Sequence, residues 1–297
     1  MSKLTKILNL WFINCMDNFS IFVFAVLGLQ VGSFLNVVIY RLPKQLQRQW
    51  RTDCAAYLDV EVPTQAEATP LLSFSTRSHC PHCGATLRAR DLVPVLSFLM
   101  LRGRCAHCQH PVSWRYPLVE LAVMAAWGLC AAQWGLSVSA VLWAGFVTTL
   151  IALAFIDADT QLLPDQLTQP LLWVGLIGAF LGHTGEPFDT AFWGAIAGYL
   201  SLWLVAFVFE KVRGQVGMGA GDFKLLAALG AWLGAWVLPV LLFLACLGVF
   251  AQALAAQCFG RSSENERIPF GPSLVAAALV MLVFKAFGFE PLKALLV

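Results

Sequence analysis

Long apolar runs separated by short polar turns dominate this chain of 297 residues. A helix that crosses a bilayer needs about 20 mostly apolar residues, because the hydrocarbon core is about 30 Å thick and a helix rises about 1.5 Å per residue. Measured against that length, the pattern predicts eight membrane-spanning helices. Their approximate ranges are 18–40, 117–134, 137–156, 167–182, 189–209, 223–237, 239–258 and 271–288.

The sixth and seventh predicted helices come from one nearly unbroken apolar run, 223–258. That run is too long for a single crossing, and Gly234 and Pro239 offer a turn that divides it. Composition agrees with a membrane protein: 59% of the residues are apolar, 12% are charged and the mean hydropathy is +0.73. A soluble domain would carry about 25% charged residues. The sequence therefore predicts an all-α polytopic membrane protein.

A long polar insert separates the first two predicted helices. Between Arg41 and Arg115 it holds ten of the nineteen Lys and Arg residues of the chain against five Asp and Glu, so it is basic. Basic loops alternate along the chain with loops that carry no Lys or Arg, which orients the basic set toward the cytosol under the positive-inside rule. We therefore expect the insert on the cytosolic side and both termini on the other. The loops 157–165, 217–222 and 261–270 should also face the cytosol.

Two Cys-x2-Cys pairs lie in the insert, Cys80 with Cys83 and Cys105 with Cys108. Each pair places two thiolates on one tight turn, and two such turns complete a tetrahedral sulfur site for Zn²⁺. Disulfides or free thiols are the alternatives, but a reducing cytosol disfavours disulfides. Four sulfur ligands leave no open position for a substrate water, so we expect the zinc to stabilise the insert rather than to catalyse.

Two aspartates stand at the ends of apolar segments. Asp157 closes one apolar run, and Asp222 follows a turn that contains Gly217, Gly219 and Gly221. A carboxylate near hydrocarbon must be hydrated, paired or protonated, so acids in such places are often functional. Glycines let the backbone approach a ligand or another helix closely. Two acids that converge at one depth would form an acid–base dyad.

The segments around Asp157 and Asp222 also fit other interpretations. Asp159 and Asp165 fit a solvated cytosolic loop, and Asp165 is placed to cap the next helix. A nucleotide-binding loop would need glycine where Asp222 stands, or a Gly-Lys-Ser/Thr sequence, and no strand precedes the turn. That interpretation therefore fails on spacing. Paired aspartates can also bind protons or cations in a transporter or channel.

Small and polar residues follow one face of the first predicted helix. Gly28 and Gly32 have the spacing of a helix-packing notch. Ser33, Asn36 and Tyr40 follow at helical spacing on the cytosolic half. They form either a packing stripe with interhelical hydrogen bonds or part of a substrate-binding surface.

Two further charged residues flank apolar segments. Glu120 lies three residues after Pro117, where the first turn of a helix favours an acid, so electrostatics at the helix start explain it. Lys224 lies two residues after Asp222. We expect it either to tune the charge of that acid or to extend to phosphate headgroups.

In combination these motifs resemble the type IV prepilin peptidases, the leader peptidases and N-methyltransferases of bacterial pilus and type II secretion systems. That family belongs to the GxGD class of membrane aspartic proteases, which also contains the presenilins. The similarity runs along nearly the whole chain. It rests on GSFLNVVIYRLP at 32–43, the two cysteine pairs, WRYPLVE at 114–120, Asp157 with Pro164 and Asp165, GAGD at 219–222 with Lys224, and IPFGP at 268–272.

The resemblance assigns the catalytic pair to Asp157 and Asp222, with Asp159 as the rival of Asp157. Gly219, Gly221 and Lys224 then belong to the active-site loop. Two close carboxylates cannot both ionise cheaply, so the pair should share one proton. The ionised acid would activate a water, and the protonated acid would polarise the scissile carbonyl group.

The resemblance also implies the substrates. They are prepilins and pseudopilins, cut after a glycine between a basic leader and an apolar helix, after which S-adenosylmethionine methylates the new N-terminal amine. We expect a multi-pass protein of the bacterial inner membrane with a cytosolic active site, surrounded by lipid and without a nucleic-acid partner. The predicted division is a first helix in 1–40, a zinc-binding insert associated with methyl transfer in 41–116, and a peptidase domain in 117–297. The sequence identifies no residues that bind S-adenosylmethionine.

Two alternatives to this function belong to other classes. A presenilin-like protease without methyltransferase activity would share the dyad but has no reason to carry the cysteine insert. A proton- or cation-coupled transporter would use the aspartates as ligands, and the cysteine pairs and the glycine-rich turn argue against it.

Overall fold

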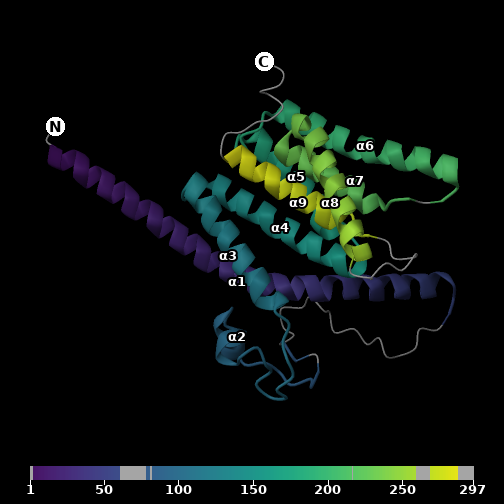
Figure 1. The fold of residues 1–297 in the computed structure, drawn as a ribbon, viewed down its shortest axis with the longest axis horizontal. Coiled ribbons are helices and arrows are strands. Elements are labelled where there is room, and N and C mark those ends of the chain that lie inside the picture. The colour runs from purple at the N-terminus through teal and green to yellow at the C-terminus, as the bar shows by residue number, and fades with distance from the viewer. Residues whose placement is uncertain (1–2, 61–77, 81, 216, 259–267, 287–297) are drawn as a thin grey trace. The chain divides into compact units, whose positions relative to one another are not determined.

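The structure is a computed structural model, and it describes residues 3–60, 78–80, 82–215, 217–258 and 268–286 (Figure 1). In this part of the chain the elements are helices, with two isolated β-bridges between 79 and 111. The α-helices are α1 (Lys3–Tyr57), α2 (Leu96–Met100), α3 (Arg115–Trp134), α4 (Val138–Thr160), α5 (Asp165–Phe180), α6 (Phe188–Arg213), α7 (Ala220–Leu233), α8 (Leu238–Cys258) and α9 (Gly271–Ala286), and the 3-10 helices are η2 (Ala89–Leu92) and η3 (Ala235–Val237).

Each of the eight predicted apolar stretches forms an α-helix, namely α1 and α3 to α9. Among the described residues, five helical segments are long and apolar enough to cross a membrane, which agrees with the predicted all-α membrane protein. The turn predicted between the sixth and seventh helices is also confirmed, because α7 ends before Gly234 and α8 begins at Leu238. Gly234 has a φ of +84°, which glycine adopts without steric cost.

The first helix is longer than predicted. We expected it to end near residue 40, but α1 continues through Pro43 to Tyr57. A proline inside a helix removes one backbone hydrogen bond and usually marks an end, which is why the sequence pattern suggested a boundary there. Lys44, Arg48 and Arg51 therefore extend the helix rather than begin a loop.

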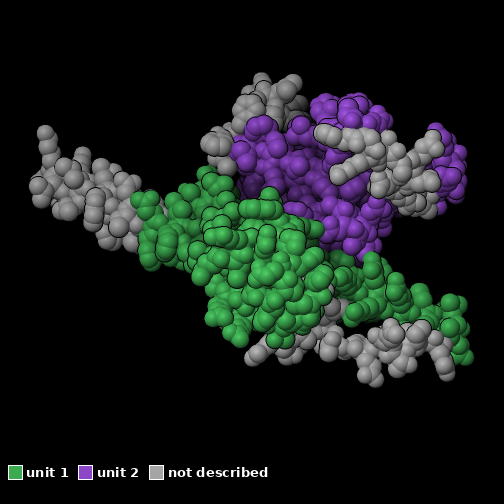
Figure 2. Space-filling model, turned by 60° about the horizontal axis from the view of Figure 1, so that its bottom comes forward, with its two compact units in different colours: residues 1–136 green, residues 137–297 purple. Residues whose placement is uncertain are grey.

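The chain divides into two compact units, residues 1–136 and 137–297 (Figure 2). In unit 1, α1 packs along α3 at the predicted glycine notch. A Cβ atom on Gly28 would lie 2.7 Å from the Cβ of Trp127, and one on Gly32 would lie 2.8 Å from the Cα of Glu120. Glycine at both positions therefore permits the close approach of the two helices. The Asn36 side chain donates a hydrogen bond to the Tyr116 carbonyl at 3.1 Å, as a packing stripe requires.

In unit 2, α7 is the central helix and packs against α5 and α6. Every side chain from 225 to 233 is buried. A Cβ atom on Gly198 of α6 would lie 2.6 Å from the Leu226 carbonyl oxygen, so that glycine lets α6 touch the α7 backbone. The Trp232 indole donates to the Leu171 carbonyl at 2.8 Å and joins α7 to α5. This packing fixes the start of α7, where Asp222 lies, relative to α5.

Candidate active site

Asp157 lies in the last turn of α4 and is only 5% exposed. Its Oδ2 atom accepts a hydrogen bond at 2.9 Å from the backbone N–H of Gly271, the first residue of α9. A Cβ atom on Gly271 would lie 2.6 Å from the same oxygen, closer than a Cβ can approach. The contact therefore requires glycine at 271. The sequence could not indicate this contact, because the backbone N–H of one residue looks like that of any other.

Asp222 lies in the first turn of α7, after the N-cap residue Gly219. An acid is favoured there, because the unpaired N–H groups of a helix start carry partial positive charge. Its Oδ2 atom lies 3.9 Å from the Cβ position of Gly219, so the side chain folds back over the turn. Asp222 is partly buried, and the charge of Asp157 acts on it electrostatically. Asp157 and Asp222 lie 65 residues apart in the sequence, yet in the folded chain they are close enough for their charges to interact.

The start of α7 is held at two points, against the loop between α4 and α5 and against the first residue of α5. A Cβ atom on Gly221 would lie 2.7 Å from the Cβ of Leu163, so glycine allows the turn to reach that loop. The Lys224 ammonium contacts both carboxylate oxygens of Asp165 at 2.7 Å. Because this loop connects the end of α4, which carries Asp157, to the start of α5, both contacts hold Asp222 on the side of α7 that faces them.

Asp165 and Asp159, the two acids nearest to Asp157 in the sequence, lie in positions different from that of Asp157. The N-cap of α5 is Pro164, so the expectation that Asp165 caps this helix is wrong; Asp165 is its first residue and pairs with Lys224. Asp159 is exposed. Residues two apart on a helix point to nearly opposite sides, which explains why Asp159 does not share the buried position of Asp157.

The prediction for Glu120 is also wrong. Because α3 begins at Arg115, Glu120 lies beyond the first turn, where the partial charge of the helix start has faded. Its side chain is 7% exposed, and its Oε2 atom accepts a hydrogen bond at 2.8 Å from the backbone N–H of Val95 in the insert. The sequence could not indicate this contact, because the donor is again a backbone group.

The four cysteines of the insert form one cluster. Their sulfur atoms all lie within 4.8 Å of one another, and the sulfurs of Cys80 and Cys108 are 3.9 Å apart. The two turns that carry them share one hydrogen-bond pattern. The N–H of Cys80 donates to the Ala85 carbonyl and that of Cys105 to the His110 carbonyl, each at 2.9 Å.

This geometry suits a metal ion bound by four sulfurs. Zinc–sulfur bonds of about 2.3 Å in a tetrahedron place the sulfurs about 3.8 Å apart. The two sulfurs of a disulfide are only about 2.05 Å apart. The backbone N–H groups of Cys83 and then His82 lower the pKa of the Cys80 thiol to about 7, whereas the pKa of the neighbouring Cys108 thiol is raised, so the pKa shifts favour the thiolate at Cys80 first. The cluster can therefore hold a metal ion in the insert.

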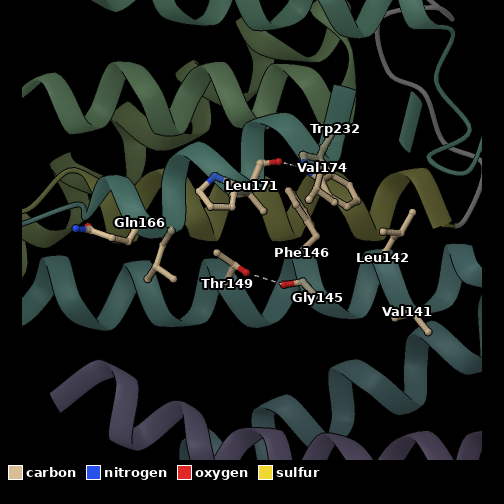
Figure 3. Close-up of a pocket in the computed structure, with 11 residues that line it drawn as sticks. Val141, Leu142, Gly145, Phe146, Thr149, Gln166, Leu171, Val174 and Trp232 are labelled. Atoms are coloured by element: carbon tan, nitrogen blue, oxygen red, sulfur yellow. Dashed lines mark hydrogen bonds between the residues drawn. The ribbon is translucent and has the colours of Figure 1, made fainter. Parts of the chain in front are cut away.

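A crevice of about 220 Å³ lies between α4 and α5, with Phe146 and Trp232 among its lining residues (Figure 3). Its lining is mostly apolar. The Thr149 hydroxyl donates to the Gly145 carbonyl at 2.9 Å, and the indole of Trp232 is bonded to Leu171, as the dashed lines show. Neither Asp157 nor Asp222 lines it. The crevice is therefore separate from the acid pair.

Comparison with known proteins assigns both parts of the chain. The model of the bacterial peptidase A24 N-terminal domain matches residues 26–134, and that of the type IV leader peptidase family matches residues 144–254. The first range falls in unit 1 and the second in unit 2.

Curated relatives match at high identity over most of their length. A protein of Neisseria gonorrhoeae is 43% identical over 275 residues, covering 91% of this chain and 92% of its own. Proteins of Burkholderia pseudomallei and Dickeya chrysanthemi are each 45% identical, covering 87% and 89% of this chain and 84% and 92% of their own. All three are named prepilin leader peptidase/N-methyltransferase. No solved structure matches this chain.

Identity at this level over most of both chains settles the relationship. The chain belongs to the type IV leader peptidase family.

Proposed function

We propose that this chain cuts the leader from type IV prepilins with Asp157 and Asp222 and methylates the amine that cleavage exposes. The observation that carries the catalytic assignment is the convergence of three helix ends. Asp157 comes from the end of α4, Asp222 from the start of α7, and the N–H of Gly271 from the start of α9. The names of the relatives support both activities.

The hydrogen bond from Gly271 makes the two acids unequal. An amide N–H can only donate, so the Asp157 oxygen that it faces must accept and cannot carry a proton toward it. Two close carboxylates share one proton, and we assign that proton to Asp222. Asp157 is then the general base and Asp222 the general acid.

The reaction follows from these roles. Asp157 takes a proton from water as the water oxygen bonds to the scissile carbonyl carbon, and Asp222 donates a hydrogen bond to the carbonyl oxygen. The tetrahedral intermediate then collapses, the C–N bond breaks, and the proton held by Asp157 passes to the leaving amine. The product is the mature protein with a free N-terminal amine, which is the group that the second reaction methylates.

Methyl transfer belongs, in this proposal, to the insert. Cys80, Cys83, Cys105 and Cys108 would bind Zn²⁺, which stabilises the two turns as one structure. S-adenosylmethionine is the methyl donor. The basic character of the insert supports a position at the cytosolic membrane face, where a basic leader leaves the bilayer.

We also propose that all eight apolar helices cross the bacterial inner membrane, with the acid pair on the cytosolic side and pseudopilins as further substrates. The helices α5, α7 and α9 have 16, 14 and 16 residues and are short for a crossing. For α7, complete burial from 225 to 233 supports a short helix surrounded by protein rather than lipid.

Purified full-length protein in detergent, incubated with a prepilin with and without S-adenosylmethionine, tests both activities by mass spectrometry. We expect loss of the leader in both samples and one added methyl group only with the donor. Loss of the leader without methylation would leave a peptidase alone. An intact prepilin in both samples would contradict the proposal and favour transport.

A further inference from the structure

The backbone of the insert is strained at Val95, just before α2. Its φ of +59° and ψ of −47° lie in a region that β-branched residues avoid. The N–H of Leu96 donates to the Pro94 carbonyl at 2.6 Å, which closes a three-residue turn around Val95. Such a turn with positive φ is the rare, strained form of the γ-turn. The turn at Val95 therefore destabilises the folded state.

Glu120 contributes a compensating contact. Its buried carboxylate accepts the Val95 N–H at 2.8 Å, and the Ser33 side chain of α1 also hydrogen-bonds to it. Among the residues that the structure describes, no basic side chain pairs with Glu120. A buried carboxylate without a cation is costly, so its hydrogen bonds must hold it. Gly32 allows α1 to approach α3 closely at Glu120, next to Ser33.

The bond between Val95 and Glu120 closes a loop that contains the second cysteine pair. Within the loop, the N–H of Gly103 donates to Phe98 of α2, and the N–H of Val112 donates to Gly103, each at 2.8 Å. The rings of Phe98 and Trp114 pack edge to face with centroids 4.8 Å apart. One continuous set of contacts therefore runs from Glu120 through Val95 and α2 to the turn that carries Cys105.

We propose that Glu120 is a positioning residue for methyl transfer, because its carboxylate clamps the strained Val95 turn and so fixes the second cysteine pair against α1 and α3. This inference rests on the proposed assignment of methyl transfer to the insert. Glu120 acts as a hydrogen-bond acceptor and takes no part in leader cleavage.

The test uses the full-length enzyme and measures cleavage and methylation of one prepilin in the same sample. Glu120→Ala removes the acceptor, and we expect methylation to fall about tenfold or more, because hydrogen bonds to charged groups are stronger than neutral ones. Cleavage should stay unchanged. Glu120→Gln keeps an acceptor oxygen and should restore most of the methylation. Bound metal is measured in each variant.

A second variant separates positioning from chemistry. Glycine adopts positive φ without strain, so Val95→Gly should recover part of the methylation lost in Glu120→Ala. Val95→Gly alone should keep both activities. Amide hydrogen exchange of the segment 94–103 should rise in Glu120→Ala and return toward the wild-type rate in Glu120→Gln.

Four results would overturn the inference. One is equal loss of cleavage and methylation in Glu120→Ala, or no loss of either. Another is a Glu120→Gln enzyme as inactive as Glu120→Ala with no rescue by Val95→Gly, because the charge itself would then be required. Wild-type enzyme that cuts without methylating would refute the proposed methyl transfer instead; unchanged exchange in Glu120→Ala would still refute the clamp on its own.

Discussion

At the residue scale, the two aspartates carry the sharpest prediction. Asp157→Asn and Asp222→Asn each remove an ionisable group with little change in shape. We expect each to lower cleavage by at least about a hundredfold, the usual contribution of general acid–base catalysis. The measurement is the initial rate of leader removal by purified enzyme in detergent.

Asp159→Asn is the matched control, because Asp159 is exposed and two residues from Asp157. It should retain cleavage. A variant of Asp159 that loses cleavage while Asp157→Asn stays active would move the dyad to Asp159.

The contact between Gly271 and Asp157 leads to a second prediction. Gly271→Ala places a methyl group 2.6 Å from the Asp157 Oδ2 atom, so the carboxylate or the start of α9 must shift. Loss of a hydrogen bond to a charged group should slow cleavage about tenfold or more. Methylation of a prepilin that was cut beforehand should continue. Gly145→Ala is the control, because a Cβ there meets nothing within 4 Å; equal effects of the two substitutions would contradict the prediction.

At the scale of elements, two contacts hold the start of α7. Their expected contributions to holding it differ in size. The ion pair of Lys224 and Asp165 has side chains 27% and 56% exposed, and exposed pairs contribute only about 0–1 kcal/mol. Lys224→Met should therefore slow cleavage by less than about fivefold. Gly221→Ala forces a Cβ to within 2.7 Å of Leu163 and should be the more damaging change. Kinetics of both variants decide the order, and the reverse order would show that charge rather than close contact holds the turn.

Most of the helices could be predicted from the sequence. Apolar runs indicated eight helices, and Gly234 marked the turn between α7 and α8, because length and glycine chemistry are visible in the residues. The extension of α1 past Pro43 was missed, since a proline and a rise in charge usually end a helix. Lys224 was recognised as part of the loop, but its partner Asp165 was not.

Backbone donors explain what the sequence could not show about the candidate site. The partner of Asp157 is the N–H of Gly271, and the partner of Glu120 is the N–H of Val95. Every residue except proline carries such a group, so neither contact has a signature in the pattern. The acids and cysteines were identifiable because their side chains are chemically distinctive.

At the scale of the whole molecule, two compact units coincide with two family domains, which suggests that the two activities can be separated. If the cysteine cluster holds the proposed zinc, Cys105→Ser or treatment with a chelator should abolish methylation, because the insert then loses its cross-link. Cleavage should continue. Metal content and the mass of the product are measured together, and loss of cleavage at full protein stability would show that the units depend on each other.

Gly271 at the start of α9 also determines which changes can test the proposed active site. Its contribution to Asp157 is made by the main chain, so side-chain mutagenesis can crowd that hydrogen bond but cannot delete it alone. Replacing the amide at position 271 with an ester by chemical synthesis would remove the donor and leave every side chain in place. The hydrogen bond from Gly271 to Asp157 can therefore be removed alone by chemical synthesis of the protein, but not by substitution of an encoded side chain.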